Sequence, residues 1–246
     1  MIQERLKALR AEMEKRGITV YVVPTADFHE SEYVGDHFKA RKFITGFTGS
    51  AGTAVITLDE AGLWTDGRYF VQAENQLKDS TVTLYRMGEE GVPTVDEFVK
   101  DRLKEGGCLG FDGRVVNGTW GGKLEKIAAE KNVSMHVTED LIDLIWEDRP
   151  ALSKQPLFIL EEKYSGKSTA DKIADLRKAM KENGADVHIL TSLYDIAWLL
   201  NIRGNDIDYV PVVLSYLVLN ETECIWFLQE EVVDDKIRAY LEENHI

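Results

Sequence analysis

FITGFTGSAGTAVITLDEAGLWTDGRYFVQAE, residues 43–74, is the most informative stretch of this chain. A glycine-rich loop leads into the apolar run 53–58, a turn follows, and a second apolar run, 62–65, comes before a helical pattern. The stretch therefore predicts two strands joined by a hairpin-like turn and followed by an amphipathic helix. It offers one arginine, Arg68, and one carboxylate, Asp66, without a nucleophile, a base and a metal cluster together. This composition is typical of an element that supports a site more than of a complete active site.

Helices and strands are expected to alternate along the first half of the chain. Apolar residues recur at helical spacing up to Met13, and Gly17 ends that first helix. Thr94 and Glu97 have the spacing of a capping box, which predicts that a helix begins there. The expected helices cover residues 1–16, 69–77, 94–103, 119–131 and 141–148, the last opened by Thr138, and the expected strands cover 19–24, 53–58, 62–65, 81–87, 109–112 and 134–138. The alternation predicts an α/β fold with a mixed sheet flanked by helices.

The composition disfavours several classes of partner. The chain has 246 residues and a net charge of −14, so we expect no nucleic acid and no membrane partner, because both attract clusters of Lys and Arg. No apolar run approaches the ~18 residues of a membrane span, and the N-terminus lacks the apolar region of a signal peptide. Cys108 and Cys224 lie far apart in apolar runs, which favours two buried free thiols. A cytoplasmic location is expected.

The chain contains an internal repeat on either side of a linker. The segment 148–156 holds two prolines and few apolar residues, which predicts a domain boundary with one domain over 1–150. LRAEMEKRGITVYVV near the N-terminus aligns with LRKAMKENGADVHIL after the linker, so that Val20 matches Val187. FITGFTGS likewise resembles WLLNIRGN. We therefore expect two tandem copies of one α/β unit, the second copy, 151–246, being truncated and missing its last strands and helices.

The glycine-rich loop GFTGSAGT, Gly46 to Thr53, leaves two structural interpretations open. A phosphate-binding loop is disfavoured, because this loop leads into a strand and has no Lys-Ser/Thr pair after it. A tight turn that needs small residues is favoured, and a loop that lines the cleft of another domain is the alternative.

The segment DFHESEY, Asp27 to Tyr33, gathers metal-ligand residue types without a metal-ligand spacing. No two histidines lie at i and i+4, and the other histidines are scattered along the chain. A polar loop that makes caps or subunit contacts is the favoured interpretation.

The segment WTDGR places Trp64, Asp66 and Arg68 at the end of an expected strand. Strand ends in α/β sheets are where ligand contacts gather, and the planar guanidinium of Arg68 suits a carboxylate or carbonyl of a peptide-like substrate. The alternative is a turn shaped by Asp66 with a solvated Arg68. No G-x-S-x-G or H-E-x-x-H motif and no carboxylate pair placed for acid–base work accompanies these residues.

The segments YVVPTADFHESEY, FITGFTGSAGTAVIT, LWTDGRYFVQAE, LIDLIWEDRP and YDIAWLLNIRGNDIDYVPV resemble the N-terminal region of the three-domain Xaa-Pro aminopeptidases (aminopeptidase P) of the creatinase/prolidase superfamily. The resemblance covers nearly the whole chain in order. It implies two related N-terminal domains with a ribonuclease-H-like creatinase N-terminal fold, followed by a "pita-bread" catalytic domain that is absent here. That domain holds two divalent metals, usually manganese, and cleaves the bond before a penultimate proline. This chain is then expected to bind no cofactor and to be inactive alone.

The resemblance also implies roles for particular residues. The N-terminal domains of the family mediate homodimerisation and restrict access to short proline-containing peptides. Arg68 is similar to an arginine that reaches the substrate cleft, with Asp66 and Trp64 supporting it. Glu32 sits where the family has a dimer-contact glutamate, and Tyr33 is adjacent to it. The parent protein is then expected to be a dimeric cytoplasmic metallo-aminopeptidase.

Two other functions remain open from the sequence. A non-enzymatic protein-binding module of the same fold is the first alternative. A ribonuclease-H-type nuclease is the second, because Asp66 and Asp112 follow strands and carboxylates at strand ends can bind Mg²⁺. The strongly acidic net charge disfavours the nuclease.

Overall fold

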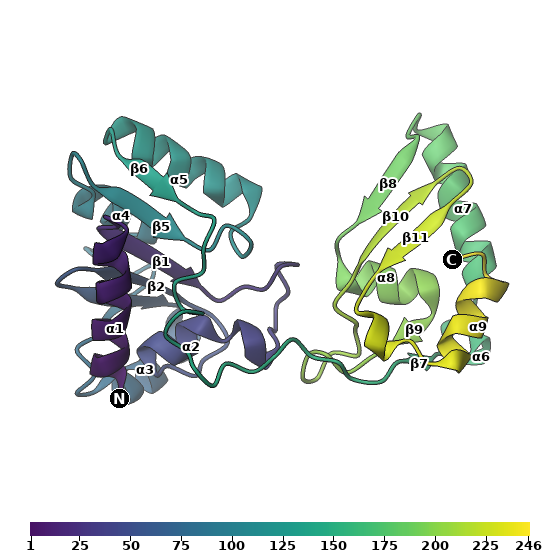
Figure 1. Cartoon of the computed structure of the whole chain (residues 1–246), viewed down its shortest axis with the longest axis horizontal. Helices are drawn as coiled ribbons and strands as arrows, with labels where there is room; N and C mark the ends of the chain where they lie inside the picture. Colours follow the sequence, from purple (N-terminus) through teal and green to yellow (C-terminus); the bar gives the residue numbers. More distant parts are fainter. The chain divides into compact units, whose positions relative to one another are not determined.

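The computed structural model describes all residues from Met1 to Ile246, and the chain forms two compact units (Figure 1). Unit 1 consists of Met1–Glu32 and His37–Pro150, and unit 2 consists of Tyr33–Asp36 and Ala151–Ile246. The short segment Tyr33–Asp36 therefore belongs to the unit that is otherwise formed by the second part of the chain.

Unit 1 is built on a six-stranded mixed sheet with the strand order β4-β3-β2-β1-β5-β6. β2 pairs antiparallel with both β1 and β3, whereas β1–β5, β5–β6 and β3–β4 are parallel pairs. The strands are β1 (Val20–Pro24), β2 (Thr53–Thr57), β3 (Ala61–Thr65), β4 (Thr83–Arg86), β5 (Cys108–Phe111) and β6 (Ser134–His136). The predicted α/β fold with a mixed sheet is confirmed.

Helices cover both faces of this sheet. The α-helices are α1 (Ile2–Lys15), α2 (Ala40–Thr45), α3 (Phe70–Leu77), α4 (Val95–Arg102) and α5 (Gly118–Glu130), with 3-10 turns η1 (Asp36–Phe38) and η2 (Gly67–Tyr69). Alternate residues of β1 point to opposite faces: Tyr21 packs in the core with α1 to α3, and Val22 packs in the core with α4 and α5. Burial on both faces explains why this strand is apolar throughout.

Local sequence signals set several helix ends as expected. Thr94 Oγ1 accepts a hydrogen bond from Glu97 N at 3.2 Å, and Glu97 Oε2 accepts one from Thr94 N at 2.8 Å. This reciprocal pair is the predicted capping box at the start of α4. Gly17 follows α1 with a φ of +67°, a conformation that glycine adopts without steric cost.

The helix predicted over 141–148 is wrong. Residues 141–145 form a hydrogen-bonded turn instead, and Asp140, rather than Thr138, opens it by accepting a bond from Ile142 N at 2.9 Å. The apolar residues that suggested a helix are used for core packing: Leu141 N donates to the Tyr21 hydroxyl at 3.0 Å. The ring of Trp146 stacks on Phe43 with 4.6 Å between centroids. Tertiary packing thus overrides the helical pattern.

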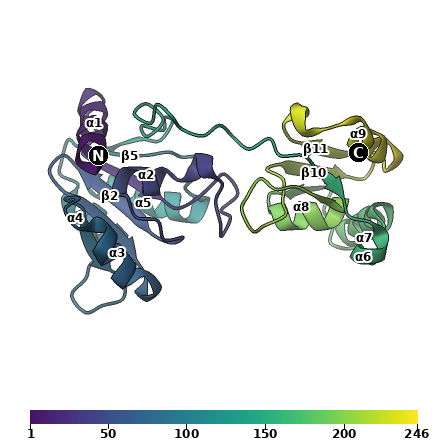
Figure 2. The ribbon, with the colours of Figure 1, turned by 90° about the horizontal axis from the view of Figure 1, so that it is seen from below.

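Unit 2 contains a three-stranded sheet with the order β11-β10-β8 and a two-stranded pair, β7–β9. Its strands are β7 (Phe158–Ile159), β8 (Val187–Leu190), β9 (Ile202–Arg203), β10 (Tyr216–Asn220) and β11 (Cys224–Phe227). Its helices are α6 (Glu162–Ser165), α7 (Thr169–Glu182), α8 (Leu193–Leu200), the 3-10 turn η3 (Glu230–Val232) and α9 (Asp235–Glu243). In Figure 2, α7 and α8 lie on one side of β10 and β11, and this side forms the buried core of the unit.

The two units repeat one pattern of helix, strand, helix and antiparallel strand pair. Arg5 of α1 donates to the carbonyl oxygen of Phe43 at 2.8 Å and lies 4.1 Å from its ring centroid. Lys172 of α7 donates to the carbonyl oxygen of Trp198 at 2.7 Å and lies 4.7 Å from a ring centroid of that residue. A positively charged side chain therefore holds the end of the second helix in each copy, at positions that the sequence repeat aligns.

Only unit 1 has helices on both faces of the repeated strands. Val20 and Val22 are 0% and 1% exposed beneath α4 and α5, whereas their counterparts Val187 and Ile189 in β8 are 54% and 63% exposed. Ile189 faces Val218 across the strand pair, and Val218 faces Ile225 on β11. Unit 2 thus presents an apolar sheet face that none of its own helices covers.

Candidate functional site

The WTDGR segment forms an exposed arginine–carboxylate pair directly after β3. Asp66 caps η2 by accepting a bond from Arg68 N at 3.1 Å. The Arg68 side chain then folds back, with Nε 2.8 Å from Asp66 Oδ1 and Nη2 2.8 Å from Oδ2. The two planar groups therefore form a bidentate pair, the geometry that arginine prefers with carboxylates.

The pairing changes the acid–base properties of both groups. The hydrogen bonds from Arg68 lower the pKa of Asp66 to about 2, and the same bonds raise the pKa of Arg68. Asp66 is therefore ionised and Arg68 charged at any physiological pH. The pair can offer a fixed guanidinium to a carboxylate or carbonyl oxygen, but it has no group that is suited to proton transfer near neutral pH.

Tyr69 lies next to this pair and is held by the glycine-rich loop. Its hydroxyl lies 2.7 Å from Ser50 Oγ, and the Arg68 guanidinium lies 5.3 Å from its ring centroid. The hydrogen bond with Ser50 lowers the pKa of Tyr69, and the charge of Arg68 adds to that effect. Ser50, Tyr69 and Arg68 thus form one connected surface at the carboxyl end of β3.

A buried arginine, Arg41, holds the glycine-rich loop through hydrogen bonds. Its guanidinium donates to the carbonyl oxygens of Phe47, at 2.6 Å, and of Gly49. Its Nε donates to Thr25 Oγ1 at 2.9 Å. The loop continues into β2, not into a helix, so it lacks the helix N-terminus that phosphate loops use. The loop bends at Ser50 and Ala51 without a hydrogen-bonded turn of its own, so its conformation depends on contacts such as those with Arg41.

Trp64 does not face the exposed pair. Its side chain is fully buried, and its Nε1 donates to the carbonyl oxygen of Pro93 at 2.7 Å. Its ring stacks on Tyr85 with 4.1 Å between centroids. Trp64 therefore anchors the end of β3 from the core side, and any contribution that it makes to a ligand site is through the position of this strand.

The DFHESEY segment is a capped polar loop. Asp27 Oδ1 accepts bonds from His29 N at 2.8 Å and Ser31 N at 3.0 Å, so the carboxylate organises the turn. Glu32 and Tyr33 are both exposed and lie where the chain passes from unit 1 to unit 2. In the whole chain no group of three or more His, Cys, Asp or Glu side chains is placed to hold a metal ion.

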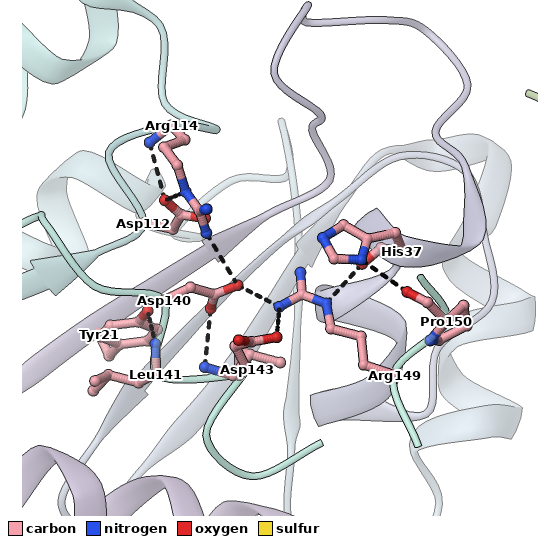
Figure 3. Close-up of polar contacts among 10 residues, drawn as sticks. Tyr21, His37, Asp112, Arg114, Asp140, Leu141, Asp143, Arg149 and Pro150 are labelled. Carbon is pink, nitrogen blue, oxygen red and sulfur yellow. Dashed lines mark hydrogen bonds and ion pairs between the residues drawn. The ribbon is translucent and has the colours of Figure 1, made fainter. Parts of the chain in front are cut away.

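A second polar cluster lies at the carboxyl end of β5 (Figure 3). Asp112 accepts bonds from Arg114 Nε at 2.9 Å and Nη2 at 3.0 Å. Asp140 accepts a bond from Arg149 Nη1 at 2.6 Å, and Arg149 Nε donates to the carbonyl oxygen of His37 at 2.9 Å. The adjoining cavity measures about 20 Å³, enough for one water molecule. The cluster therefore ties chain segments together and leaves no space for a ligand.

The structure does not assemble a nuclease site from the carboxylates that the sequence suggested. Asp66 follows β3 and Asp112 follows β5, and two strands, β2 and β1, lie between them in the sheet. Three strand spacings separate the two by about 14 Å. Each carboxylate is also neutralised by its own arginine, Arg68 or Arg114. The carboxylates therefore cannot share a pair of metal ions.

Sequence reasoning found Asp66 and Arg68 but missed the residues that hold them. Ser50, Tyr69 and Arg41 have no motif of their own. Arg41 lies beside Lys42 in the short helix α2, so the sequence does not show which of the two cations is buried.

Residues 5–145 match a family described as the creatinase/prolidase N-terminal domain, and residues 148–246 match a second family of the same description. This chain belongs to the creatinase/prolidase N-terminal domain family. The matches cover both units and agree with the repeat. The ribonuclease-H-like creatinase N-terminal fold expected from the sequence is confirmed.

The curated relatives are longer proteins. The chain is 43% identical over 244 residues to a probable Xaa-Pro aminopeptidase P of Sordaria macrospora, a match that spans 98% of this chain and 40% of the relative. It is 40% identical over 248 residues to aminopeptidase P1 of Lotus japonicus, spanning 100% of this chain and 37% of the relative. The chain thus spans about two fifths of the length of these relatives.

A solved structure of a related enzyme resembles this chain over its full length. The X-prolyl aminopeptidase of Caenorhabditis elegans, described as a cytosolic enzyme with a di-nuclear active site, superposes with a TM-score of 0.93 at 34% identity. The match covers 100% of this chain and 42% of that protein.

None of the helices in this chain combines the length and the apolar character needed to span a membrane.

Proposed function

We propose that this chain is the non-catalytic N-terminal region of an Xaa-Pro aminopeptidase, an enzyme that removes the N-terminal residue before a penultimate proline. The similarity to Xaa-Pro aminopeptidases over 98% or more of the chain supports this proposal. We further propose that residues 1–150 and 151–246 are its two related N-terminal domains. A cytoplasmic location is consistent with the description of the C. elegans relative as cytosolic.

The bidentate pair of Arg68 and Asp66 is the observation that carries the proposed site. It places a fixed, exposed guanidinium at the end of β3, braced by Tyr69. We assign to Arg68 the task of orienting a carboxylate or carbonyl of a short proline-containing peptide at the edge of the substrate cleft, with Asp66 holding the guanidinium and Trp64 holding the strand.

The residues of this chain do not fit a di-nuclear metal centre. No three potential ligands are placed together, and the carboxylates nearest the candidate sites are paired with arginines. We therefore assign the two metals, which we expect to be manganese, and the hydrolytic chemistry to the catalytic portion of the longer relatives. The chain alone is expected to be inactive.

A comparison of this chain with a longer chimera tests the proposal. The chimera joins the chain to the portion of the Sordaria macrospora relative that it does not match, and both proteins are assayed on a Xaa-Pro-Xaa tripeptide with Mn²⁺. We expect cleavage by the chimera only. Cleavage by this chain alone would contradict the proposal.

The role of Arg68 is tested in the same chimera. Arg68→Ala is expected to lower kcat/KM by about 10-fold or more through lost substrate orientation. Arg102→Ala is the matched control, because Arg102 makes a similar two-pronged pair with Glu60 in the β2–β3 turn, at the opposite end of the strands. If Arg68→Ala and Arg102→Ala have the same kcat/KM, Arg68 does not orient the substrate.

We also propose a homodimer that uses the exposed loop containing Glu32 and Tyr33. Light scattering of the chimera should give the mass of two chains, and the double variant Glu32→Ala/Tyr33→Ala should shift it toward one. An unchanged mass for the variant would place the dimer contact elsewhere.

A further inference from the structure

Arg41 is a buried arginine that has no carboxylate partner. It is 4% exposed, and its three hydrogen bonds go to Thr25 Oγ1 and to the carbonyl oxygens of Phe47 and Gly49. Burial lowers the pKa of this guanidinium to about 10. A buried charge without an opposite charge is costly, so the three hydrogen bonds of Arg41 must offset the cost of its desolvation. The cost of burying this charge indicates that Arg41 does more than fill space in the core.

The contacts of Arg41 hold the glycine-rich loop in one conformation. The guanidinium lies 4.7 Å from the ring centroid of Phe47, in addition to its bonds to the loop carbonyls. Thr25, which accepts from Arg41, donates in turn to the carbonyl oxygen of Gly52 at 2.8 Å. Both ends of the loop are therefore tied to one point at the end of β1.

The loop is pressed against Tyr69. The rings of Phe47 and Tyr69 meet edge to face with 5.8 Å between centroids, and Ser50 Oγ lies 2.7 Å from the Tyr69 hydroxyl. A Cβ atom at Gly49 would lie 2.8 Å from Cδ1 of Tyr69 and 2.2 Å from Cζ of Phe47. The contact leaves no room for a side chain, so a shift of the loop must move Tyr69 or release it.

Tyr69 in turn borders the exposed guanidinium. Its backbone N–H donates to the carbonyl oxygen of Asp66 at 3.0 Å, and Arg68 packs beside its ring. The contacts thus form a continuous path from Arg41 through Phe47 and Tyr69 to Arg68.

We propose that Arg41 is a positioning residue that fixes the glycine-rich loop against Tyr69 and thereby sets the orientation of Arg68 toward substrate. The inference rests on the role proposed above for Arg68. Arg41 does not itself touch substrate. A lysine should not replace it fully, because one ammonium lacks the planar fork that reaches two carbonyl oxygens and a hydroxyl at once.

The titration of Tyr69 reports the loop position in this chain without any catalytic portion. The phenol signal is assigned with Tyr69→Phe and followed by NMR against pH in the wild type, Arg41→Met, Arg41→Lys and Ser50→Ala. The Ser50 bond lowers the pKa of Tyr69 in the wild type. Arg41 and Tyr69 interact electrostatically, so Arg41→Met raises the pKa of Tyr69 partly through loss of charge, whereas Arg41→Lys keeps the charge and reports the loop position. We expect Ser50→Ala and Arg41→Lys to return the pKa of Tyr69 toward about 10.

The variant Arg5→Met is the control that shows whether a general loss of stability by itself changes the titration of Tyr69. Arg5 also donates to a backbone carbonyl and stacks on a phenylalanine of unit 1, Phe43, but it does not touch the loop. We expect Arg5→Met to lower Tm while the Tyr69 titration stays as in the wild type. A wild-type titration in Arg41→Lys, or in Arg41→Met if the Lys variant does not fold, would overturn the inference.

Kinetics of the chimera distinguish failure of this inference from failure of the proposed function. We expect Arg41→Lys to lower kcat/KM by about 10-fold, mainly through KM, because a misplaced Arg68 binds substrate less well. If Arg68→Ala leaves kcat/KM unchanged, the role proposed for Arg68 fails, and with it the reason to position Arg68. If Arg68→Ala impairs cleavage and Arg41→Lys does not, only the positioning role fails.

Discussion

Arg10 in unit 1 and Arg177 in unit 2 make the same hydrogen bond. Arg10 Nε lies 2.9 Å from the carbonyl oxygen of Thr57, the last residue of β2. Arg177 Nε lies 2.9 Å from the carbonyl oxygen of Asn220, the last residue of β10. In both units a helix is thus tied to the same corner of a strand hairpin, at the positions that the sequence repeat aligns.

We expect Arg10→Met and Arg177→Met to destabilise their own units by similar amounts. Each removes one partly buried, charge-assisted bond, which is worth about 1.5–3 kcal/mol. Arg10→Met also removes an exposed bond to the carbonyl oxygen of Glu60, which adds little because it is exposed. Native-state hydrogen exchange, assigned to unit 1 and unit 2 separately, measures the two losses. A loss in the unit that was not mutated would show that the contact does not act locally.

The ion pair between Asp66 and Arg68 should persist in strongly acidic solution. Because the pKa of Asp66 is lowered to about 2, the pairing stabilises the folded chain above the unfolded pKa of about 4. That contribution is lost as pH falls through about 2. The carboxyl ¹³C shift of Asp66 should report a midpoint near pH 2 in the wild type and a higher one in Arg68→Ala, where only backbone bonds still lower the pKa. Equal midpoints would contradict the pairing.

Trp64→Phe should destabilise unit 1 by about 1–3 kcal/mol, because the carbonyl oxygen of Pro93 loses its buried donor. Urea unfolding followed by circular dichroism measures the change. Trp198→Phe is the control, since the Trp198 side chain is half exposed and should cost less. A cost for Trp198→Phe as large as for Trp64→Phe would argue against the buried bond as the cause.

The apolar face of β8, β10 and β11 should bind a hydrophobic dye. Ile189→Glu is expected to reduce ANS fluorescence with little effect on Tm, because the side chain is exposed. Val71→Glu in α3, at a residue that is also exposed, should leave dye binding unchanged. Identical dye binding by the two variants would show that this face is not the binding surface.

The sequence predicted the fold well where local patterns and packing agree. Apolar spacing in α1 and the capping box at Thr94 both act over a few residues, and both were found. The helix predicted over 141–148 failed because Leu141 and Trp146 are held by Tyr21 and Phe43, partners that lie far away in sequence.

The candidate site was predictable only in part, for the same reason. Asp66 and Arg68 lie two residues apart, so their pairing follows from the turn that joins them. Arg41 is linked to Thr25 by a fold contact over 16 residues, and Ser50 to Tyr69 over 19. The spacing of these residues in the sequence does not predict such contacts, because only the folded sheet brings the residues together.

The clamps formed by Arg5 with Phe43 and by Lys172 with Trp198 bear on the origin of the chain. Both partners differ between the copies, yet a cation still caps a carbonyl and covers an aromatic ring in each. Such a match follows naturally from duplication of one ancestral gene segment, after which each copy changed its residues in compensating pairs. Exchanging both residues of one clamp for those of the other should therefore be tolerated better than exchanging either residue alone.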